Sequence, residues 1–287
     1  MPDAESLLLP TEMLTPTRVE REYNNRNLVP GHPAIFRRWE EDSEHVRATR
    51  RGRLDLAYGT EGRHRVDIFP ARGSDRLLVF FHGGYWRGLD KRMFAWLAPA
   101  WAAEGVSLAL VNYRLCPAVR IADIVDDAVA AVNWAMANAA AHGAESRRVV
   151  LAGHSAGAHL VAAVMAAAPE RLRFAPARIA GAVPVSGIVD FSPMPFFSGN
   201  ADLRLDAAAA RALDLHDRRP TIPAPIVVAV GGDESGEFIR QSRLLADRWS
   251  PQVRELQVVP GRHHFSVLDA FAEPGQPLHE ATLALFR

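Results

Sequence analysis

The sequence predicts an α/β fold, in which a mostly parallel central sheet is covered by helices on both faces. Two observations carry this prediction. The apolar runs at residues 77–81 and 106–113 are continuous, as is typical of strands that are buried on both faces. Helical patterns separate the successive strand patterns, and this alternation is typical of a parallel sheet with crossover helices.

The composition limits the class of protein. The chain has 287 residues, of which 48% are hydrophobic, so it can bury a sizeable core. Its 33 basic and 33 acidic side chains balance, whereas a nucleic-acid-binding protein normally carries a basic surplus, so we expect no nucleic-acid partner. No run of about 18 uncharged apolar residues occurs, so we expect no membrane span. A single cysteine, Cys116, and first residues unlike a secretory leader predict a cytoplasmic location.

The expected elements follow one another along the chain. Strand patterns occur at residues 54–58, 66–69, 77–81, 106–113, 149–152, 179–185, 226–230 and 256–259. Helical patterns occur at residues 91–104, 121–141, 158–168, 237–249 and 278–286. Pro99 predicts a kink in the first of these helices, and Gly143 is a stop signal for the second.

Two segments do not fit this alternation. Residues 1–50 show no sustained periodicity and mix prolines with charges, so we expect an N-terminal arm that contributes to a lid. The main domain is then expected to span residues 51–287. Within it, residues 187–224 are too long and irregular for a plain connection, which predicts a lid insertion there.

A nucleophile motif stands between a strand pattern and a helical pattern. Residues 153–157 read Gly-His-Ser-Ala-Gly, the G-x-S-x-G pattern of a sharp turn that lifts a serine above the edge of a sheet. Such a turn needs strained backbone at Ser155 and neighbours without a side chain, which Gly153 and Gly157 supply. We therefore predict that Ser155 is a catalytic nucleophile.

A second glycine motif follows the apolar run 77–81. Residues 82–86 read His-Gly-Gly-Tyr-Trp. Backbone amides are fixed dipoles that stabilise the negative oxygen formed during acyl transfer, and glycines let the backbone approach closely. We predict an oxyanion hole made by the amides of Gly83, Gly84 and Ala156. Tyr85 and Trp86 either line the acyl pocket or pack the loop.

A serine hydroxyl needs a histidine as base and a carboxylate to orient that histidine. In the chain order Ser, acid, His, the acid candidates are Asp233 and Glu234, which follow one late strand pattern. The base candidates His263 and His264 follow the last one, and the residues alone leave both choices open. No H-E-x-x-H, Walker A or G-x-G-x-x-G pattern occurs, so we expect no metal and no cofactor.

With these motifs in place, the chain resembles the α/β-hydrolase superfamily and, more narrowly, the kynurenine formamidase (arylformamidase) family. Further signs of this resemblance are Glu-Arg-Glu-Tyr-Asn at residues 20–24, Glu-Ser-Gly-Glu-Phe at 234–238 and Arg-Gln-Ser at 240–242. The resemblance implies an α/β-hydrolase fold with His264 as base and Glu234 as acid. The family commonly has Asp at that position, which keeps Asp233 as the alternative acid.

The resemblance implies hydrolysis of a small-molecule aryl amide or ester with a small acyl group, such as N-formylkynurenine. A broad short-chain carboxylesterase is the close alternative, and a non-catalytic ligand-binding relative is an alternative of another class. Phenylalanines in the expected lid suggest an apolar substrate wall, for which we name Phe196 and Phe197 beside Tyr85 and Trp86. A homodimer is a further possibility.

Overall fold

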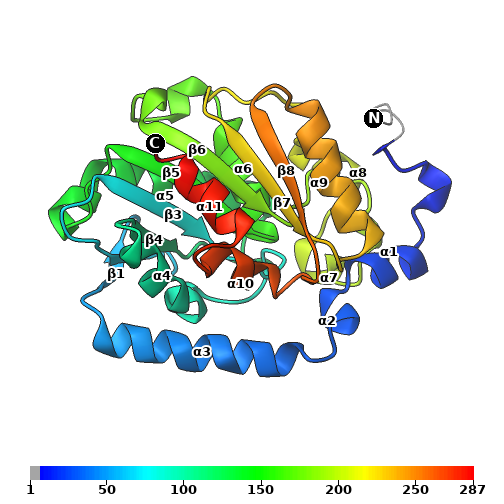
Figure 1. Cartoon of the computed structure of the whole chain (residues 1–287). Helices are drawn as coiled ribbons and strands as arrows, with labels where there is room; N and C mark the ends of the chain where they lie inside the picture. The colour runs from blue at the N-terminus through cyan, green and yellow to red at the C-terminus, as the bar shows by residue number, and fades with distance from the viewer. Residues whose placement is uncertain (1–6) are drawn as a thin grey trace.

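The computed structural model describes residues 7–287, which fold around an eight-stranded sheet (Figure 1). The first six residues, which begin the expected arm and carry part of the leader argument, lie outside the described residues. The strands are β1 Arg53–Ala57, β2 Arg65–Phe69, β3 Arg76–Phe81, β4 Ser107–Val111, β5 Arg148–His154, β6 Ile179–Val185, β7 Ile226–Gly231 and β8 Val253–Val259.

The order of the strands in the sheet is β1-β2-β4-β3-β5-β6-β7-β8. The pairs β1–β2 and β2–β4 are antiparallel, and the remaining pairs are parallel. The central strands are buried along almost their whole length, because helices cover both sides of the sheet. The predicted α/β class, a mostly parallel sheet with helices on both faces, is therefore confirmed.

The helices divide between the two faces of the sheet (Figure 1). One face packs against α5 (Ile121–Asn138), α6 (Ala156–Met165) and α9 (Gly236–Arg248). The other packs against α3 (His32–Thr49), the 3₁₀ segment η3 (Lys91–Leu97), α4 (Ala98–Ala103), α10 (Val267–Ala272) and α11 (Pro277–Ala284). Short helices complete the chain: η2 (Thr11–Met13), α1 (Pro16–Tyr23), α2 (Asn25–Leu28), η4 (Ala139–His142), η5 (Pro169–Arg171), η6 (Pro176–Arg178), η7 (Met194–Phe196), α7 (Asn200–Leu203) and α8 (Ala207–Leu213).

The observed helices differ from the predicted ones at three places. The pattern at 91–104 is not one kinked helix but η3 followed by α4, and Pro99 lies in the first turn of α4, where its missing N–H leaves no bond unmade. The arm contains an 18-residue helix, α3, although residues 1–50 show no sustained periodicity. Helix α10 also goes unpredicted. Both α3 and α10 pack against the same face of the sheet as η3 and α4.

The first two helices of the arm are held on α9 by a buried polar network. The Tyr23 hydroxyl donates to Oε2 of Glu237 at 2.8 Å and accepts from Nε2 of Gln241 at 2.9 Å. The side-chain oxygen of Gln241 accepts the amides of Val189 and Asp190 in the segment after β6. The network thus ties the run at 20–24 to the runs at 234–238 and 240–242, although more than 200 residues separate them in the chain. The division of the chain into an arm, a main domain and a lid insertion stays a prediction.

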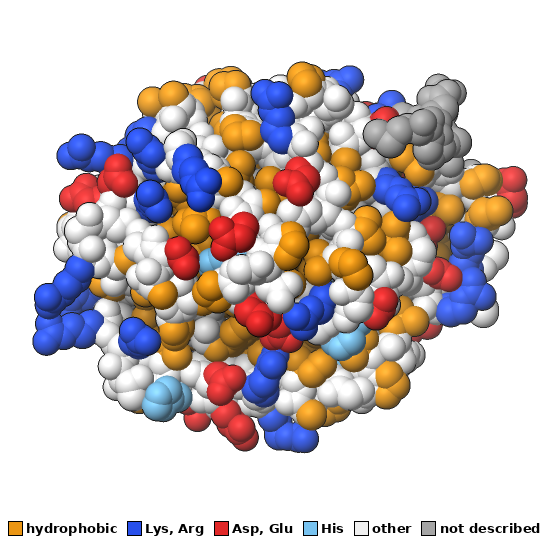
Figure 2. Space-filling view, viewed as in Figure 1, with side chains coloured by type: hydrophobic (Ala, Val, Ile, Leu, Met, Phe, Trp, Pro, Cys, Tyr) orange, Lys and Arg blue, Asp and Glu red, His pale blue; other side chains and the backbone are white. Residues whose placement is uncertain are grey.

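The outer surface agrees with the balanced composition. Figure 2 shows acidic and basic side chains interspersed on the face that it displays, with no field of a single sign. Among residues 7–287, no helix is both long enough and apolar enough to cross a membrane.

Candidate active site

The carboxyl ends of the parallel strands meet at one edge of the sheet, where Ser155 directly follows β5. Ser155 has φ 55° and ψ −118°, a left-handed and strained conformation, and its amide donates to the carbonyl of Val185 at 2.8 Å. A Cβ atom at Gly157 would lie 2.0 Å from the carbonyl oxygen of Phe81, and one at Gly153 would lie 2.3 Å from the carbonyl oxygen of Gly157. The two glycines therefore make the turn possible, as the sequence predicts.

The predicted oxyanion loop lies next to this turn. Gly84 has φ +115°, and a Cβ atom there would come within 2.3 Å of the carbonyl oxygen of Gly88. A Cβ atom at Gly83 would lie 3.1 Å from the Cβ of Ser155, so the loop and the serine are in contact. Ala156 is the first residue of α6, where a backbone amide has no partner within the helix. The structure thus brings Gly83, Gly84 and Ala156 around the serine.

His82 braces the loop from beneath. Its Nδ1 lies 2.7 Å from the carbonyl of Gly83, and its Nε2 lies 3.1 Å from Oδ1 of Asn112. The Tyr113 ring stacks on the imidazole with a centroid distance of 4.5 Å. Burial lowers the pKa of His82 to about 4, so the ring stays neutral at pH 7. A neutral, fixed ring suits a structural support for the loop better than a base.

His264 follows β8 and meets Glu234, which follows β7. Nδ1 of His264 lies 2.6 Å from Oε2 of Glu234. The other oxygen of Glu234 accepts the Ser186 hydroxyl at 2.5 Å and the Gly231 amide at 2.7 Å. Both side chains are buried, at 4% and 0% exposure. The carboxylate is therefore fixed by three hydrogen bonds and holds the imidazole in one orientation.

The neighbouring candidates point elsewhere. Asp233 is exposed, and its amide donates to the carbonyl of Arg262. Nδ1 of His263 accepts the amides of Phe265 and Ser266, both at 3.2 Å, so this ring organises the chain before α10. Burial, followed by the charge of His264, lowers the pKa of His263. The hydrogen bond between residues 234 and 264 distinguishes one acid and one histidine from their neighbours, which sequence reasoning from the residues alone could not do.

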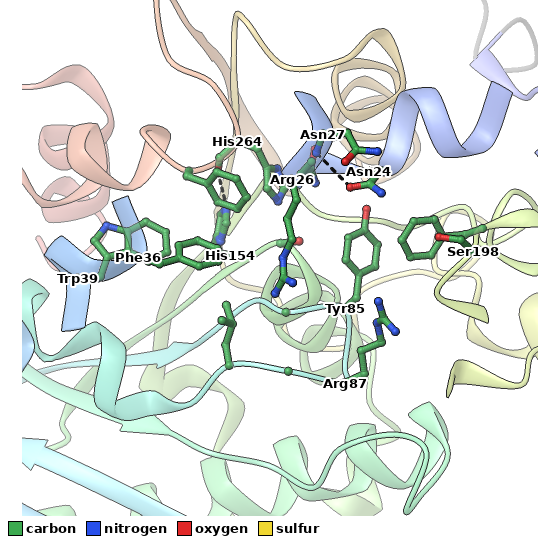
Figure 3. A pocket seen from close by; sticks show the side chains of 17 residues that line it. Asn24, Arg26, Asn27, Phe36, Trp39, Tyr85, Arg87, His154, Ser198 and His264 are labelled. Atoms are coloured by element: carbon green, nitrogen blue, oxygen red, sulfur yellow. Dashed lines mark hydrogen bonds between the residues drawn. The ribbon is translucent and has the colours of Figure 1, made fainter. Parts of the chain in front are cut away.

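The serine and the histidine face one cavity of about 490 Å³ (Figure 3). Within residues 7–287 no hydrogen bond engages the Ser155 hydroxyl, so the oxygen is free to meet a substrate or the imidazole. The cavity is lined by Asn24, Asn25, Arg26, Asn27, Phe36, Trp39, Gly84, Tyr85, Arg87, Gly88, Leu89, His154, Ser155, Phe197, Ser198, His264 and Phe265. Its volume is in the range of sites that hold one small molecule.

Two of the four predicted wall residues line this cavity. Tyr85 and Phe197 stack on each other with ring centroids 4.7 Å apart. Trp86, by contrast, is fully buried between Phe191 and His159 and does not line the cavity, so of the two roles predicted for it the structure shows packing of the loop. Phe196 is 38% exposed and is not among the lining residues, because the turn of η7 directs it to the surface.

Sequence reasoning missed the contribution of the arm and of His154. Asn24, Asn25, Arg26 and Asn27 come from the start of α2, and Phe36 and Trp39 from α3. His154 precedes the serine, and its Nε2 donates to the carbonyl of His264 at 2.7 Å. Burial, followed by the charge of His264, lowers the pKa of His154 well below its ordinary value. The only signals for these residues were the run at 20–24 and the second position of the G-x-S-x-G pattern.

Among the described residues, one group has the geometry of possible metal ligands. Ligand atoms of Asp190, Asp214 and His216 lie within 4.8 Å of one another. Nη2 of Arg240 already pairs with Asp190 at 2.9 Å, and none of the three lines the cavity. The group therefore belongs to the packing of the segment after β6 rather than to the site.

The site residues form an arrangement suited to acyl transfer. A strained serine faces the cavity, a buried carboxylate fixes a histidine on the same cavity, and glycine-rich backbone lies beside the serine. Such groups can attack a carbonyl carbon, carry the proton and stabilise the oxygen that becomes negative.

The chain is similar to known proteins over most of its length. A family model for the alpha/beta hydrolase fold matches residues 78–216, which include Ser155 and the glycine loop. Kynurenine formamidase of Salmo salar is 26% identical over 283 residues, covering 94% of this chain and 93% of the relative. That of Danio rerio is 27% identical over 237 residues, covering 79% and 78%. A solved structure of a "putative thioesterase" from Silicibacter sp. TM1040 is 34% identical, with a TM-score of 0.81, over 93% of this chain and 98% of that chain.

Proposed function

This chain belongs to the α/β-hydrolase family, and from that premise we propose that Ser155, His264 and Glu234 are its catalytic triad. The chain is a hydrolase; the assignment of roles to its residues is the proposal. The observation that carries it is the 2.6 Å contact between His264 and Glu234 on the cavity that also exposes Ser155. Asp233 is not the orienting acid in this proposal, because it is exposed, whereas the buried carboxylate of Glu234 holds the imidazole.

The first half of the reaction follows from these roles. Nε2 of His264 takes the proton of the Ser155 hydroxyl while the oxygen attacks the substrate carbonyl. Glu234 holds the Nδ1 proton, which keeps the other nitrogen free to act as the base. The amides of Gly83, Gly84 and Ala156 bind the oxygen of the tetrahedral intermediate. His264 then gives its proton to the leaving amine or alcohol.

The second half repeats the same steps with water. Water replaces the leaving group, His264 takes a proton from it, and the new oxygen attacks the acyl group on Ser155. The tetrahedral intermediate again places its negative oxygen on the loop amides. Collapse of this intermediate breaks the bond between the acyl carbon and Ser155, His264 returns its proton to the serine oxygen, and the acid is released.

The substrate that we propose is an aryl formamide of the N-formylkynurenine type. Support comes from the kynurenine formamidases that align with 94% and 79% of this chain. The aromatic side chains of Phe36, Trp39 and Tyr85 on the cavity also suit an aryl group. A short-chain carboxylesterase is the second candidate, because the solved structure at 34% identity is named a putative thioesterase, and a thioester, like a carboxylic ester, is an acyl compound without an amide bond.

One comparison of rates tests the proposal. The kcat/KM for N-formylkynurenine is measured beside that for p-nitrophenyl acetate, with Ser155→Ala as the control. We expect both activities to vanish in Ser155→Ala and the formamide to be the better substrate of the native protein. A ratio that strongly favours the ester would replace the formamidase by the carboxylesterase, and activity that survives in Ser155→Ala would overturn the triad.

A cytoplasmic location and a homodimer stay predictions.

A further inference from the structure

Within the described part of the chain, the cavity is lined by arginines and histidines but by no acidic side chain. Arg26 and Arg87 line it, together with His154 and His264, and no aspartate or glutamate is among the lining residues. Figure 3 shows Arg26 reaching from the arm into the middle of the cavity, between Tyr85 and the histidines, with Arg87 below Tyr85. Positively charged side chains on the low-dielectric walls of a cavity attract an anionic ligand.

The two arginines differ in how their charges are satisfied. Arg87 pairs with Asp202 of α7, which lies outside the lining residues. Arg26 has no carboxylate within 4.0 Å among residues 7–287, so its charge meets no counter-ion from that part of the chain. Its guanidinium lies over the ring of Phe36, 5.9 Å from the ring centroid, which holds the group against the aromatic side of the cavity.

The arm that carries Arg26 is fixed in place. The side-chain oxygen of Asn24 accepts the amide of Asn27 and so caps the first turn of α2 around Arg26. Tyr23 precedes Asn24, and its carbonyl accepts a hydrogen bond from the hydroxyl of Tyr85, next to the oxyanion loop. Arg26 is therefore held in a defined position relative to the loop and, through it, to Ser155.

We propose that Arg26 binds a carboxylate of the substrate and so determines specificity. The inference rests on the proposed function and deepens it: the substrates are acyl amides or esters whose leaving group carries an anionic carboxylate beside an aromatic ring. A guanidinium presents planar paired donors that match a carboxylate, and the exposed Arg26 is open to a ligand that enters the cavity. Phe36 and Trp39 then face the aryl part of the same molecule.

The test uses two acetyl esters that differ at one group, which is an anionic carboxylate in one and its neutral methyl ester in the other. 4-Acetoxybenzoate and methyl 4-acetoxybenzoate share the acetyl group and the ring, and the intrinsic difference in their reactivity is removed by dividing by their rates of hydrolysis in hydroxide. The readout is the ratio of kcat/KM for the acid to kcat/KM for the methyl ester. It is measured for the native protein, Arg26→Gln, Arg26→Lys and the control Arg21→Gln. Arg21 belongs to the same arm, is 70% exposed and does not line the cavity.

We expect the native ratio to exceed one and to fall about 10- to 100-fold in Arg26→Gln, the range for loss of a hydrogen bond to a charged group. Arg26→Lys should recover part of the ratio, and Arg21→Gln should keep it. Added NaCl at 0.5 M should reduce the native ratio, because salt screens the charge. The Lys variant matters because a merely structural role of Arg26 would not make the ratio follow the charge.

The outcomes separate the inference from the proposed function. A native protein that hydrolyses both esters with the same ratio as Arg26→Gln overturns the role of Arg26 and leaves the hydrolase intact. A folded native protein that hydrolyses neither these esters nor N-formylkynurenine overturns the proposed function and, with it, the inference. A ratio that falls equally in Arg21→Gln shows a general effect of charge on the arm and also overturns the role of Arg26.

Discussion

At the scale of single residues, Glu234 is the group whose environment is most specific. Three hydrogen bonds from a histidine, a hydroxyl and an amide converge on its buried carboxylate. One of its oxygens is left for the imidazole alone, so the carboxylate can orient the ring and stabilise the positive charge that forms on it. Asp233, one residue earlier, shares none of these contacts.

The two acids can be distinguished by matched substitutions. Glu234→Gln keeps the size of the side chain but favours the wrong imidazole tautomer, and we expect kcat to fall by about 10³- to 10⁴-fold. Asp233→Asn is the matched control and should change kcat less than about twofold. Steady-state kinetics with p-nitrophenyl acetate measure both. The roles would be reversed if the asparagine variant were the inactive one.

The site could be predicted in part because some of its requirements are local. The turn at Ser155 needs glycines two residues away on either side, so its signature lies within five consecutive residues. The choice between Asp233 and Glu234 depends on how β7 and β8 lie beside each other, which is a long-range property. Tryptophan is a residue type that often lines substrate cavities, yet the backbone directs Trp86 into the core. No local sequence pattern distinguishes a tryptophan on the cavity wall from one in the core.

At the scale of elements, the position of the arm depends on one buried tyrosine. The Tyr23 hydroxyl joins Glu237 and Gln241 of α9, and the backbone of Tyr23 accepts the hydroxyl of Tyr85. Removal of the hydroxyl would leave the Glu237 carboxylate, itself buried, without one of its donors. A buried polar group that loses its partner costs about 1–3 kcal/mol.

We therefore expect Tyr23→Phe to loosen α1 and α2 from α9. Limited proteolysis should cut residues 16–31 at least several-fold faster than in the native protein, and the free energy of unfolding should fall by about 1–3 kcal/mol. Tyr58→Phe is the matched control, since it also removes a buried hydroxyl, one that donates to the Asn112 carbonyl far from the arm. Equal cleavage of the arm in both variants would show that Tyr23 does not anchor it.

The helix α3 shows why some elements escaped prediction. Its 18 residues bury only Trp39, Ser43 and Val46, a narrow stripe that includes a polar residue. Seven of the other 15 positions are charged, so the apolar periodicity that indicates a helix is weak. The strands β3, β5 and β7, which are buried on both faces, have continuous apolar sequences and were predicted to within a few residues. Burial on both faces leaves a stronger local pattern than a single narrow contact.

At the scale of the whole molecule, several buried histidines are held neutral. Burial lowers the pKa of His82 to about 4 and that of His159 to about 3, and it lowers that of His154 further below its ordinary value. In the unfolded chain these rings take up protons near pH 6.5. Between that pH and the folded pKa, the unfolded state binds more protons than the folded state. The free energy of unfolding therefore decreases as the pH falls below about 6.5.

Replacement of one such ring should reduce this dependence. His159 is 1% exposed, and its Nδ1 has no partner among residues 7–287. We expect His159→Gln to lose about 2 kcal/mol less stability than the native protein between pH 7.5 and 5.0, because one proton less is linked to unfolding. Urea denaturation at both pH values measures this. An unaltered slope in His159→Gln would contradict the argument.

The separate origins of the two walls of the cavity have a consequence for how such enzymes diversify. The proposed reacting groups follow strand ends, whereas Asn24 to Asn27, Phe36 and Trp39 belong to the amino-terminal helices, of which α3 packs on the outer layer of one face of the sheet. Selectivity can thus drift, or be transplanted between relatives by exchanging this segment, while the reactive core is inherited unchanged. Natural variation and deliberate redesign would both begin at the amino-terminal helices.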